Sequence, residues 1–228
     1  MPAIGVADGV SLAIFLVVWL GYSWTGDHGP LAEKGLSSAM NVQRRRWMET
    51  MSRRDLRMID TAIMAGLQQG TAFFASACIF AIGGCFALLG SAERIATISA
   101  DLPFYGGLDR ALVELKLLGL VLIFAYAFFK FGWAYRLFNY CSILIGAVPM
   151  PSDSCADPAV RERAIVRATA LNQIAGRNFN TGLRAIFFAI AYLGWFLGPY
   201  ALVVSTVVVV AIIANRQYRS AAHDAVSD

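Results

Sequence analysis

Long apolar stretches separated by short polar and basic segments are the main feature of this sequence. Four of these stretches are apolar around most of a helical circumference, which is typical of helices that face lipid and neighbouring helices. Each is near or above the roughly 20 residues that a helix needs to cross the hydrocarbon core of a bilayer. We therefore predict an all-α protein, a four-span transmembrane helical bundle with helices extended into the cytoplasm. The predicted spans are residues 8–25, 61–90, 111–136 and 184–214.

The chain is predicted to be a single integral membrane domain over residues 1–228. Its cytoplasmic helical region is expected at residues 31–60 and 137–183, where polar residues flank the apolar stretches. The helix of the second span should begin early, because the Ser-Arg-Arg-Asp sequence at residues 52–55 resembles a capping box. A helix from Ser52 to Leu89 would be about 57 Å long, so its first third should protrude from the membrane.

A second protruding helix is predicted to lead into the fourth span. Asp157 is a good N-cap residue, and Pro158 is well suited to the first helical position. Proline removes a helical hydrogen bond, and glycine weakens a helix interior. The breaks that we expect in this helix are at Gly176, at Gly182 and at the Gly198-Pro199 pair.

Two shorter segments leave alternatives open. Leu36–Met51 places its large apolar side chains on one face of a helix, as in helices that lie on a membrane surface. The same pattern fits a helix that covers the cytoplasmic end of the bundle. Leu137–Val148 has the length of a buried or re-entrant segment. A continuation of the third helix is the preferred interpretation of Leu137–Val148.

Lysine and arginine are unevenly distributed among the connections. The loop after the first span carries seven of them, the loop before the fourth span carries four, and the N-terminal tail carries none. Basic residues concentrate in cytoplasmic loops. We therefore predict a multi-pass protein of the bacterial inner membrane, also called the cytoplasmic membrane, with both termini periplasmic.

The overall composition supports the membrane assignment. The chain is 58% hydrophobic and 15% charged, whereas a soluble domain is just under half apolar and about a quarter charged. The net charge of +4 would be compatible with nucleic-acid binding in a soluble protein. Here the arginines lie mainly in two loops beside the spans, so we predict anionic lipids of the bilayer as partners and no nucleic acid.

Motifs for catalysis or cofactor binding are missing from the sequence. It contains no Walker loop, no GxSxG, no HExxH and no dinucleotide fingerprint. His28 and His223 both lie outside the predicted spans, so one chain cannot supply a transmembrane bis-histidine haem site. The four cysteines include no CxxC pair. We therefore expect no metal, no cofactor and no enzymatic activity.

Polar side chains near the inner interface are candidate pore residues. Amides at this depth can hydrogen-bond between helices, and intramembrane charges often mark an ion or substrate path. Ordinary adhesion between helices is the alternative. Lys116 and Lys130 could line an anion path, although their spacing favours amines that extend toward opposite headgroup layers. The predicted pore or polar layer consists of Gln68, Gln69, Lys130, Arg136, Asn139 and Arg184.

Two further residue groups are predicted to contact helices or lipid. GxxxG patterns at residues 66–70 and 194–198 let helix backbones approach closely, and contacts within one protomer are favoured over a dimer face. The predicted packing residues are Gly66, Gly70, Gly194 and Gly198. Basic residues and tryptophan beside a span are typical of contacts with lipid headgroups. The predicted headgroup residues are Arg44, Arg45, Arg46, Trp47, Arg53 and Arg54.

Several segments together resemble a widespread family of bacterial and plant integral membrane proteins, which is defined only as a domain of unknown function. The similar segments are Asn41–Met48, Asp60–Ser76, Lys130–Pro149, Gly176–Ala185 and Gly194-Trp195-Phe196. The resemblance covers most of the chain. It implies a multi-span membrane protein and transfers no catalytic residue.

The sequence-based hypothesis is a homo-oligomer that forms a channel or transporter-like pore. Its basis is a small subunit with polar groups at one depth and with glycines suited to close packing. Four helices alone rarely enclose a path, so several copies would be needed. The alternative is a non-catalytic scaffold or accessory subunit that binds a larger membrane complex or anionic lipid.

Overall fold

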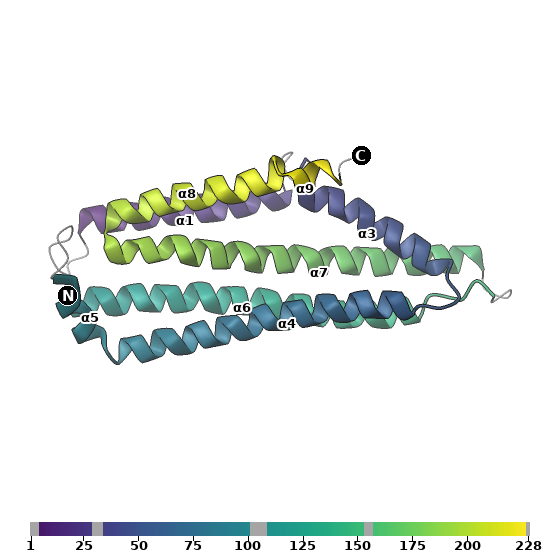
Figure 1. The fold of residues 1–228 in the computed structure, drawn as a ribbon, viewed down its shortest axis with the longest axis horizontal. Coiled ribbons are helices and arrows are strands. Elements are labelled where there is room, and N and C mark those ends of the chain that lie inside the picture. The colour runs from purple at the N-terminus through teal and green to yellow at the C-terminus, as the bar shows by residue number, and fades with distance from the viewer. Residues whose placement is uncertain (1–4, 29–33, 101–108, 153–156, 227–228) are drawn as a thin grey trace.

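The computed structural model describes residues 5–28, 34–100, 109–152 and 157–226, and every regular element within these ranges is a helix (Figure 1). The elements are α1 (Val6–His28), α3 (Leu36–Ser52), α4 (Met58–Leu89), α5 (Ala92–Ala100), α6 (Arg110–Gly146), α7 (Pro158–Leu193), the 3-10 helix η1 (Gly194–Leu197), α8 (Pro199–Tyr218) and α9 (Ala221–Asp224). The prediction of an all-α protein is confirmed.

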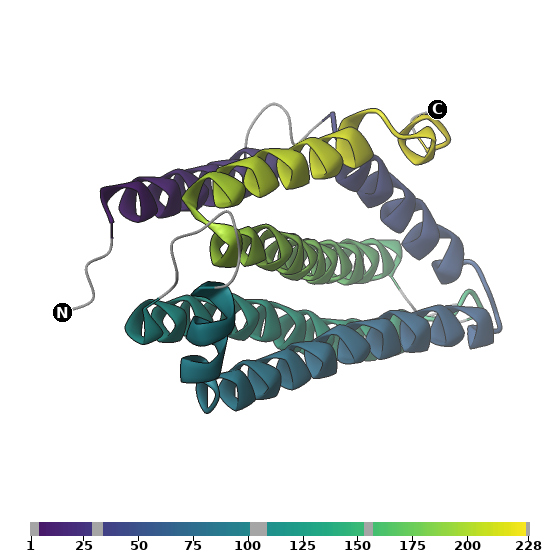
Figure 2. The same cartoon turned by 60° about the vertical axis from the view of Figure 1, so that its left-hand side comes forward.

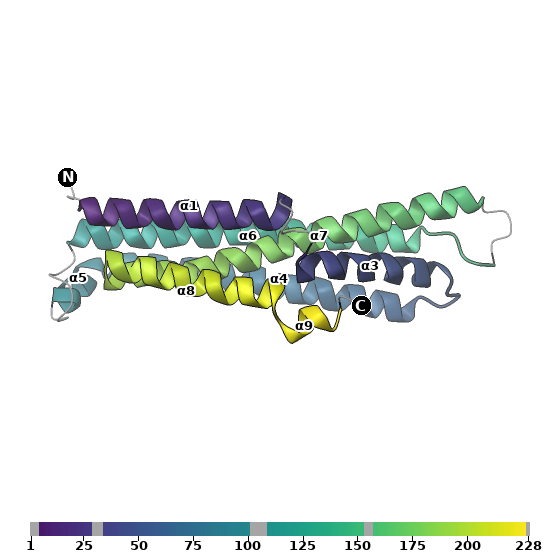
Figure 3. The ribbon, with the colours of Figure 1, turned by 90° about the horizontal axis from the view of Figure 1, so that it is seen from above.

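Three long helices form the frame of the molecule. Helices α4, α6 and α7 lie side by side, with α6 between the other two (Figures 1 and 2). Helices α1 and α8 run along one half of α7, and α3 covers its other half (Figure 3). We call these two parts the five-helix half and the α3 half.

The helix lengths differ between the two halves. Helices α1 and α8 have 23 and 20 residues, which gives about 30–35 Å and matches a hydrocarbon core of about 30 Å. Helices α4, α6 and α7 have 32, 37 and 36 residues, or about 48–55 Å. Within the described residues, five helices are long and apolar enough to cross a membrane. The length of the five-helix half therefore matches the thickness of a bilayer, and the α3 half adds to that length.

The predicted fourth span is divided into two helices. Residues 184–214 form the end of α7, η1 and most of α8, and α8 runs back along α7 (Figure 1). Gly198 has φ 132° and ψ 167°, a conformation that glycine adopts without a Cβ clash. Pro199 begins α8, since a helix can start but not continue at proline. The four-span count is thus not confirmed, because five helices qualify.

The extra helix changes where the chain ends lie. Helix α1 begins at one end of the five-helix half, and α8 ends at the opposite end of that half, beside α9 (Figure 1). Two termini on one side of a membrane require an even number of crossings. Five crossings would place the two termini on opposite sides of the membrane, so the structure does not show that both termini are periplasmic.

Other helix boundaries agree in part with the predictions. Asp157 accepts a hydrogen bond of 2.9 Å from the backbone nitrogen of Ala159 and caps α7 as expected. Helix α6 continues to Gly146, which agrees with the preferred interpretation of Leu137–Val148 as a continuation of the third helix. Helix α7 passes through Gly176 and Gly182 without a break. These glycines instead leave room for side chains, Arg44 at Gly176 and Phe131 at Gly182.

The predicted capping box at Ser52 is wrong. Ser52 ends α3, and its hydroxyl donates a hydrogen bond of 2.7 Å to the backbone oxygen of Glu49. The chain turns before α4 begins at Met58. This turn is held by Arg57, whose guanidinium donates to backbone carbonyl oxygens at the end of α6. The acceptors are Ile145, Val148 and Pro149, at 2.8, 2.7 and 3.1 Å.

Helix α3 packs on the extended helices. Met48 and Met51 are fully buried in a core of the α3 half that also contains Phe138 and Cys141. A second core, around Phe188 in the five-helix half, joins α1, α6, α7 and α8. Of the two alternatives for Leu36–Met51, the structure favours a helix that covers the end of the bundle.

A candidate anion-binding pocket

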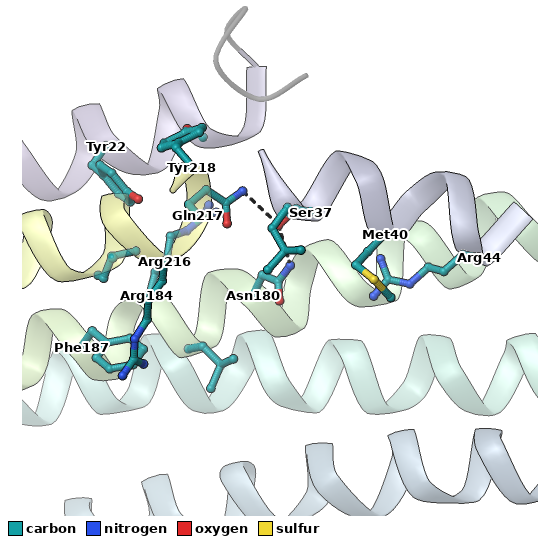
Figure 4. A pocket seen from close by; sticks show the side chains of 14 residues that line it. Tyr22, Ser37, Met40, Arg44, Asn180, Arg184, Phe187, Arg216, Gln217 and Tyr218 are labelled. Carbon is teal, nitrogen blue, oxygen red and sulfur yellow. Dashed lines mark hydrogen bonds between the residues drawn. The ribbon is translucent and has the colours of Figure 1, made fainter. Parts of the chain in front are cut away.

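A pocket lies where the two halves of the molecule meet, at the start of α3 and near the ends of α1 and α8 (Figure 4). Its volume is about 280 Å³. Four helices contribute to it, and its walls combine apolar, amide and basic side chains. The lining residues are Tyr22, Gly26, Leu36, Ser37, Met40, Arg44, Asn180, Leu183, Arg184, Phe187, Ile213, Arg216, Gln217 and Tyr218.

The charged side chains of this lining are three arginines. Arg44 comes from α3, Arg184 from α7 and Arg216 from α8. None of the lining residues, as far as the structure describes the chain, is an aspartate or glutamate. Asp27 and His28 follow Gly26 in the sequence, but their side chains are outside the described part. The described lining therefore carries three positive charges.

Ser37 lies at the centre of a polar group that ties three helices together. Its hydroxyl oxygen accepts hydrogen bonds from the amide nitrogens of Asn180 on α7, at 3.2 Å, and Gln217 on α8, at 3.3 Å. In Figure 4 this group lies between Arg44 on one side and Arg184 and Arg216 on the other. The hydroxyl hydrogen of Ser37 is left to donate, because both amides use the oxygen as acceptor.

Two glycines leave space for the guanidinium groups of Arg184 and Arg44, and an aromatic ring contacts the guanidinium of Arg216. A Cβ atom at Gly26 would lie 2.9 Å from Nη1 of Arg184, and one at Gly176 would collide with the guanidinium of Arg44. The guanidinium carbon of Arg216 lies 5.8 Å from the centre of the Phe187 ring, within the range of a cation–π contact.

The electrostatics of Arg44 fit an anion site. Arg44 is half-buried, and it donates a hydrogen bond of 2.8 Å to the neutral side chain of Asn41. Burial lowers the pKa of the Arg44 guanidinium below its ordinary value. The surrounding protein thus disfavours this positive charge, and a bound anion would relieve the penalty. Guanidinium groups match the geometry of phosphate and carboxylate oxygens.

Comparison with known proteins bears on the family of the chain and not on this pocket. The sequence model of a family described as "Protein of unknown function, DUF599" matches residues 10–222. The chain belongs to the DUF599 family. The match spans nearly all of the chain, which confirms the resemblance to an uncharacterised family. No curated protein and no solved structure matches the chain.

The predicted polar layer is not one cluster in this DUF599 protein. Arg184 lines the pocket, whereas Gln68 donates a hydrogen bond of 3.0 Å to Ser142 between α4 and α6. Lys130 lies over the ring of Tyr126, at 5.5 Å. The Nε atom of Arg136, an exposed residue, donates to the hydroxyl of Tyr140, at 2.7 Å. Gln69 is exposed on α4 and Asn139 is half-buried on α6.

The predicted headgroup residues divide into two groups. Arg44 lines the pocket, while Trp47 and Arg54 each donate a 2.7 Å hydrogen bond to Oδ1 of the buried Asp60. The remaining three are exposed. They are Arg45, which pairs with Glu49 at 2.9 Å, together with Arg46 and Arg53. Contact of these exposed arginines with lipid stays a prediction.

The interpretation of Lys116 as an interfacial lysine is wrong. Its side chain is fully buried, and its amine donates a hydrogen bond of 2.7 Å to the backbone oxygen of Trp195. The amine also lies 3.9 Å from Oδ1 of Asp8 in α1. This pair joins α1, α6 and η1, and sequence spacing along one helix cannot show which other helices cover a residue.

The two GxxxG patterns have different outcomes. An added Cβ atom at Gly66 or Gly70 would meet no atom within 4 Å, so no helix of the same chain packs closely on them in the described part. The expected packing within one protomer is not seen there. At Gly194 an added Cβ would lie 2.8 Å from the backbone oxygen of Ala201. Gly194 therefore permits close approach of α8, and Gly198 forms the turn.

Among the residues described with their side chains, no group of three or more histidines, cysteines, aspartates and glutamates could hold a metal ion. Cys78, Cys85 and Cys141 are buried and free, and Cys155 lies outside the described residues. The basic pocket is therefore the site that we develop below.

Proposed function

We propose that this protein is a non-enzymatic, multi-pass protein of the bacterial inner membrane that binds the headgroup of an anionic lipid in the basic pocket. The observation that carries the proposal is the set of three arginines, Arg44, Arg184 and Arg216, that three helices bring to one cavity. Basic pockets between transmembrane helices on the cytoplasmic side are typical sites for anionic headgroups.

Five crossings, with a periplasmic N-terminus and a cytoplasmic C-terminus, are part of the proposal. This orientation assigns the α3 half, the α6–α7 connection and the end of α8 to the cytoplasm. Arg216 and Arg219 at the end of α8 then join the basic residues around α3 and at the start of α7. The positive-inside rule is satisfied better than it would be with four spans.

The depth of the pocket supports a headgroup ligand. Arg216 follows Pro199 by 17 residues in α8, which is about 26 Å along the helix. A hydrocarbon core of about 30 Å that begins near Pro199 would end close to Arg216. The basic pocket would then open at the level of the cytoplasmic headgroups, where anionic lipid is available.

The homo-oligomeric pore and the accessory role in a larger complex stay predictions. The residues expected to line a pore do not form one cluster, whereas the pocket residues share one cavity. Lipid binding is therefore the first function to test. Lipid binding is part of the predicted accessory role, whereas it would not by itself indicate a pore.

The test is a lipid titration of the full chain, purified in detergent, followed by native mass spectrometry. We expect retention of an anionic lipid, such as phosphatidic acid or phosphatidylglycerol, over phosphatidylcholine. The Arg184→Gln/Arg216→Gln variant should bind about tenfold more weakly or worse, since a hydrogen bond to a charged group contributes about 1.5–3 kcal/mol.

The matched control is Arg163→Gln/Arg167→Gln, which removes the same charge from exposed positions outside the pocket and outside the predicted headgroup residues. It should bind lipid like the unchanged protein. Helix content and thermal midpoint are compared for both variants, so that misfolding is recognised. Equal binding of phosphatidylcholine, or equal loss in both double variants, would refute the proposed function.

A further inference from the structure

We propose a second site, in the α3 half, that binds the soft monovalent metal ion Cu(I) through the thiol sulfur of Cys141 and the thioether sulfur of Met64. The inference goes beyond lipid binding in the basic pocket and does not depend on it. Three observations support it. Sulfur atoms from two helices meet one buried amide, this amide has an oxygen without a hydrogen-bond partner, and the surrounding core is apolar.

The three long helices each contribute one side chain to this site. Met64 lies on α4, Cys141 on α6 and Asn172 on α7, and all three are buried. The Nδ2 atom of Asn172 lies 3.6 Å from Sδ of Met64 and 3.6 Å from Sγ of Cys141. Two sulfur atoms that are far apart in the sequence therefore approach the same amide group.

Asn172 is a fully buried polar residue in an apolar core. Its Oδ1 atom accepts no hydrogen bond in the part of the chain that the structure describes. Its Nδ2 atom donates to two sulfur atoms, and thiols and thioethers are weak acceptors. Buried polar groups without good partners are costly, and a bound ion is one of the features that explain them. A thiolate beside Nδ2 would be a better acceptor, because charge-assisted hydrogen bonds are the stronger ones.

The types of ligand at this site indicate which metal it would bind. Thiolate and thioether sulfur are soft ligands of the kind that bind Cu(I). Zinc is bound instead by thiolate, imidazole and carboxylate groups, usually four of them. The side chains that the structure describes contain no group of three or more cysteines, histidines, aspartates and glutamates suited to a metal ion. The site therefore favours Cu(I) over zinc, because methionine supplies its second sulfur.

Binding exchanges a proton for the metal ion. The Cys141 thiol donates to the backbone oxygen of Ala168, at 3.5 Å. A coordinating thiol loses its proton to water, so a sulfur–copper bond replaces the sulfur–hydrogen bond and no electron is transferred. Cu(I) and one thiolate together are neutral, whereas a divalent ion would leave a positive charge in the core. Asp60, one turn before Met64 in α4, is already paired with Arg54 at 2.7 Å.

Apolar side chains surround the site. Met48 and Met51 from α3 are fully buried in the same core, together with Phe138 of α6. Such a shell limits the access of water to a metal ion and thereby influences its redox potential. A cavity of about 160 Å³ lies between α3 and α7 and adjoins this core, because Ile165 belongs to both. This cavity offers an approach to the site from the surface.

The experiment is a Cu(I) titration of the full chain in detergent, without oxygen, in competition with a chromogenic Cu(I) chelator such as bicinchoninate. The reference protein and all variants carry Cys155→Ser, so that a cysteine outside the described residues supplies no ligand. We expect one Cu(I) ion per chain and a higher thermal midpoint with the metal, since a ligand that binds only the folded state stabilises it. An equal concentration of Zn²⁺ should not displace the copper.

Substitutions at the site should weaken Cu(I) binding. Asn172→Leu should lower the affinity by about 10–100-fold, the usual effect of removing an outer-shell partner, and Cys141→Ser by about 100-fold or more. Met64→Leu should lower it by at least about tenfold, and it should fold, because leucine and methionine have similar volumes. The matched control Cys85→Ser/Met58→Leu changes another buried cysteine and an exposed methionine. It should bind Cu(I) like the reference protein.

X-ray absorption at the copper edge identifies the ligands directly. In protein that contains selenomethionine we expect copper–selenium scattering, which Met64→Leu should remove. Helix content is compared for every variant, and Met64→Leu tests the site even if Cys141→Ser does not fold. A folded reference protein that retains no Cu(I), or an equal loss of binding in the control, refutes the site. Binding that depends on Cys141 but not on Met64 overturns the thioether ligand.

Discussion

The indole Nε1 of Trp195 donates a 2.7 Å hydrogen bond to Oδ1 of Asp8, a residue 187 positions earlier in the chain. The amine of Lys116 lies 3.9 Å from the same carboxylate oxygen. One carboxylate therefore links the beginning of α1 to α6 and to η1. Because Lys116 is fully buried, this link is an ionic contact away from water.

Lys116→Met should destabilise the protein by about 3–5 kcal/mol, since it breaks the buried ion pair between the Lys116 amine and the Asp8 carboxylate. The measurement is thermal or denaturant unfolding in detergent. Asp8→Asn/Lys116→Met removes both charges and should recover most of the lost stability. A single variant as stable as the unchanged protein would show that the ion pair does not contribute.

Gly198→Ala should destabilise the α7–α8 turn by about 1–3 kcal/mol, the usual range for a residue forced into a disfavoured backbone conformation. The cause is the positive φ of 132° at Gly198. Gly132→Ala is the matched control, because an added Cβ there meets no atom within 4 Å. In a helix interior alanine is preferred over glycine by about 0.5–1 kcal/mol. Equal loss of stability in both variants would contradict this account of the turn.

Arg57→Gln should loosen the connection between α3 and α4 and cost at least about 2 kcal/mol, because Arg57 donates to three backbone carbonyl groups at the end of α6. Faster proteolysis within residues 53–57 and a lower thermal midpoint are the expected readouts. Arg53→Gln changes an exposed arginine in the same turn and should stay within about 0.5 kcal/mol. The prediction fails if the two substitutions have the same effect.

The proposed sidedness can be tested with single cysteines in a Cys155→Ser background. Val6→Cys, at an exposed position in α1, should react with a membrane-impermeant maleimide added from the periplasm. Ala222→Cys, after α8, should react only once the inner membrane is permeabilised. The remaining cysteines, Cys78, Cys85 and Cys141, are buried. Labelling of both positions from the periplasm would rule out five crossings.

Much of the fold could be predicted because it depends on local properties of the sequence. Apolar stretches longer than a bilayer requires indicated the extended helices, and the Asp157-Pro158 pair indicated the start of α7. The Gly198-Pro199 break was also predicted. The reversal of the chain into a separate helix α8 was not predicted, because a local pattern marks a break without giving the angle between the helices on its two sides.

Tertiary contacts explain the remaining differences. The turn between α3 and α4 contains neither glycine nor proline. It is stabilised by Arg57, whose backbone acceptors lie 88 or more residues later in the sequence. The pocket combines residues from Tyr22 to Tyr218. No spacing within one helix could bring these residues together. Arg44 and Arg184 were each selected from the sequence, but for different sites.

The pairing of α1 with α8 has a consequence for biosynthesis. Helix α1 leaves the ribosome first among these helices, and its main partner α8 leaves among the last. The apolar surface that buries Phe15 thus stays without its final neighbour until translation reaches α8. A nascent chain that stops before α8 would therefore lack the main packing partner of α1.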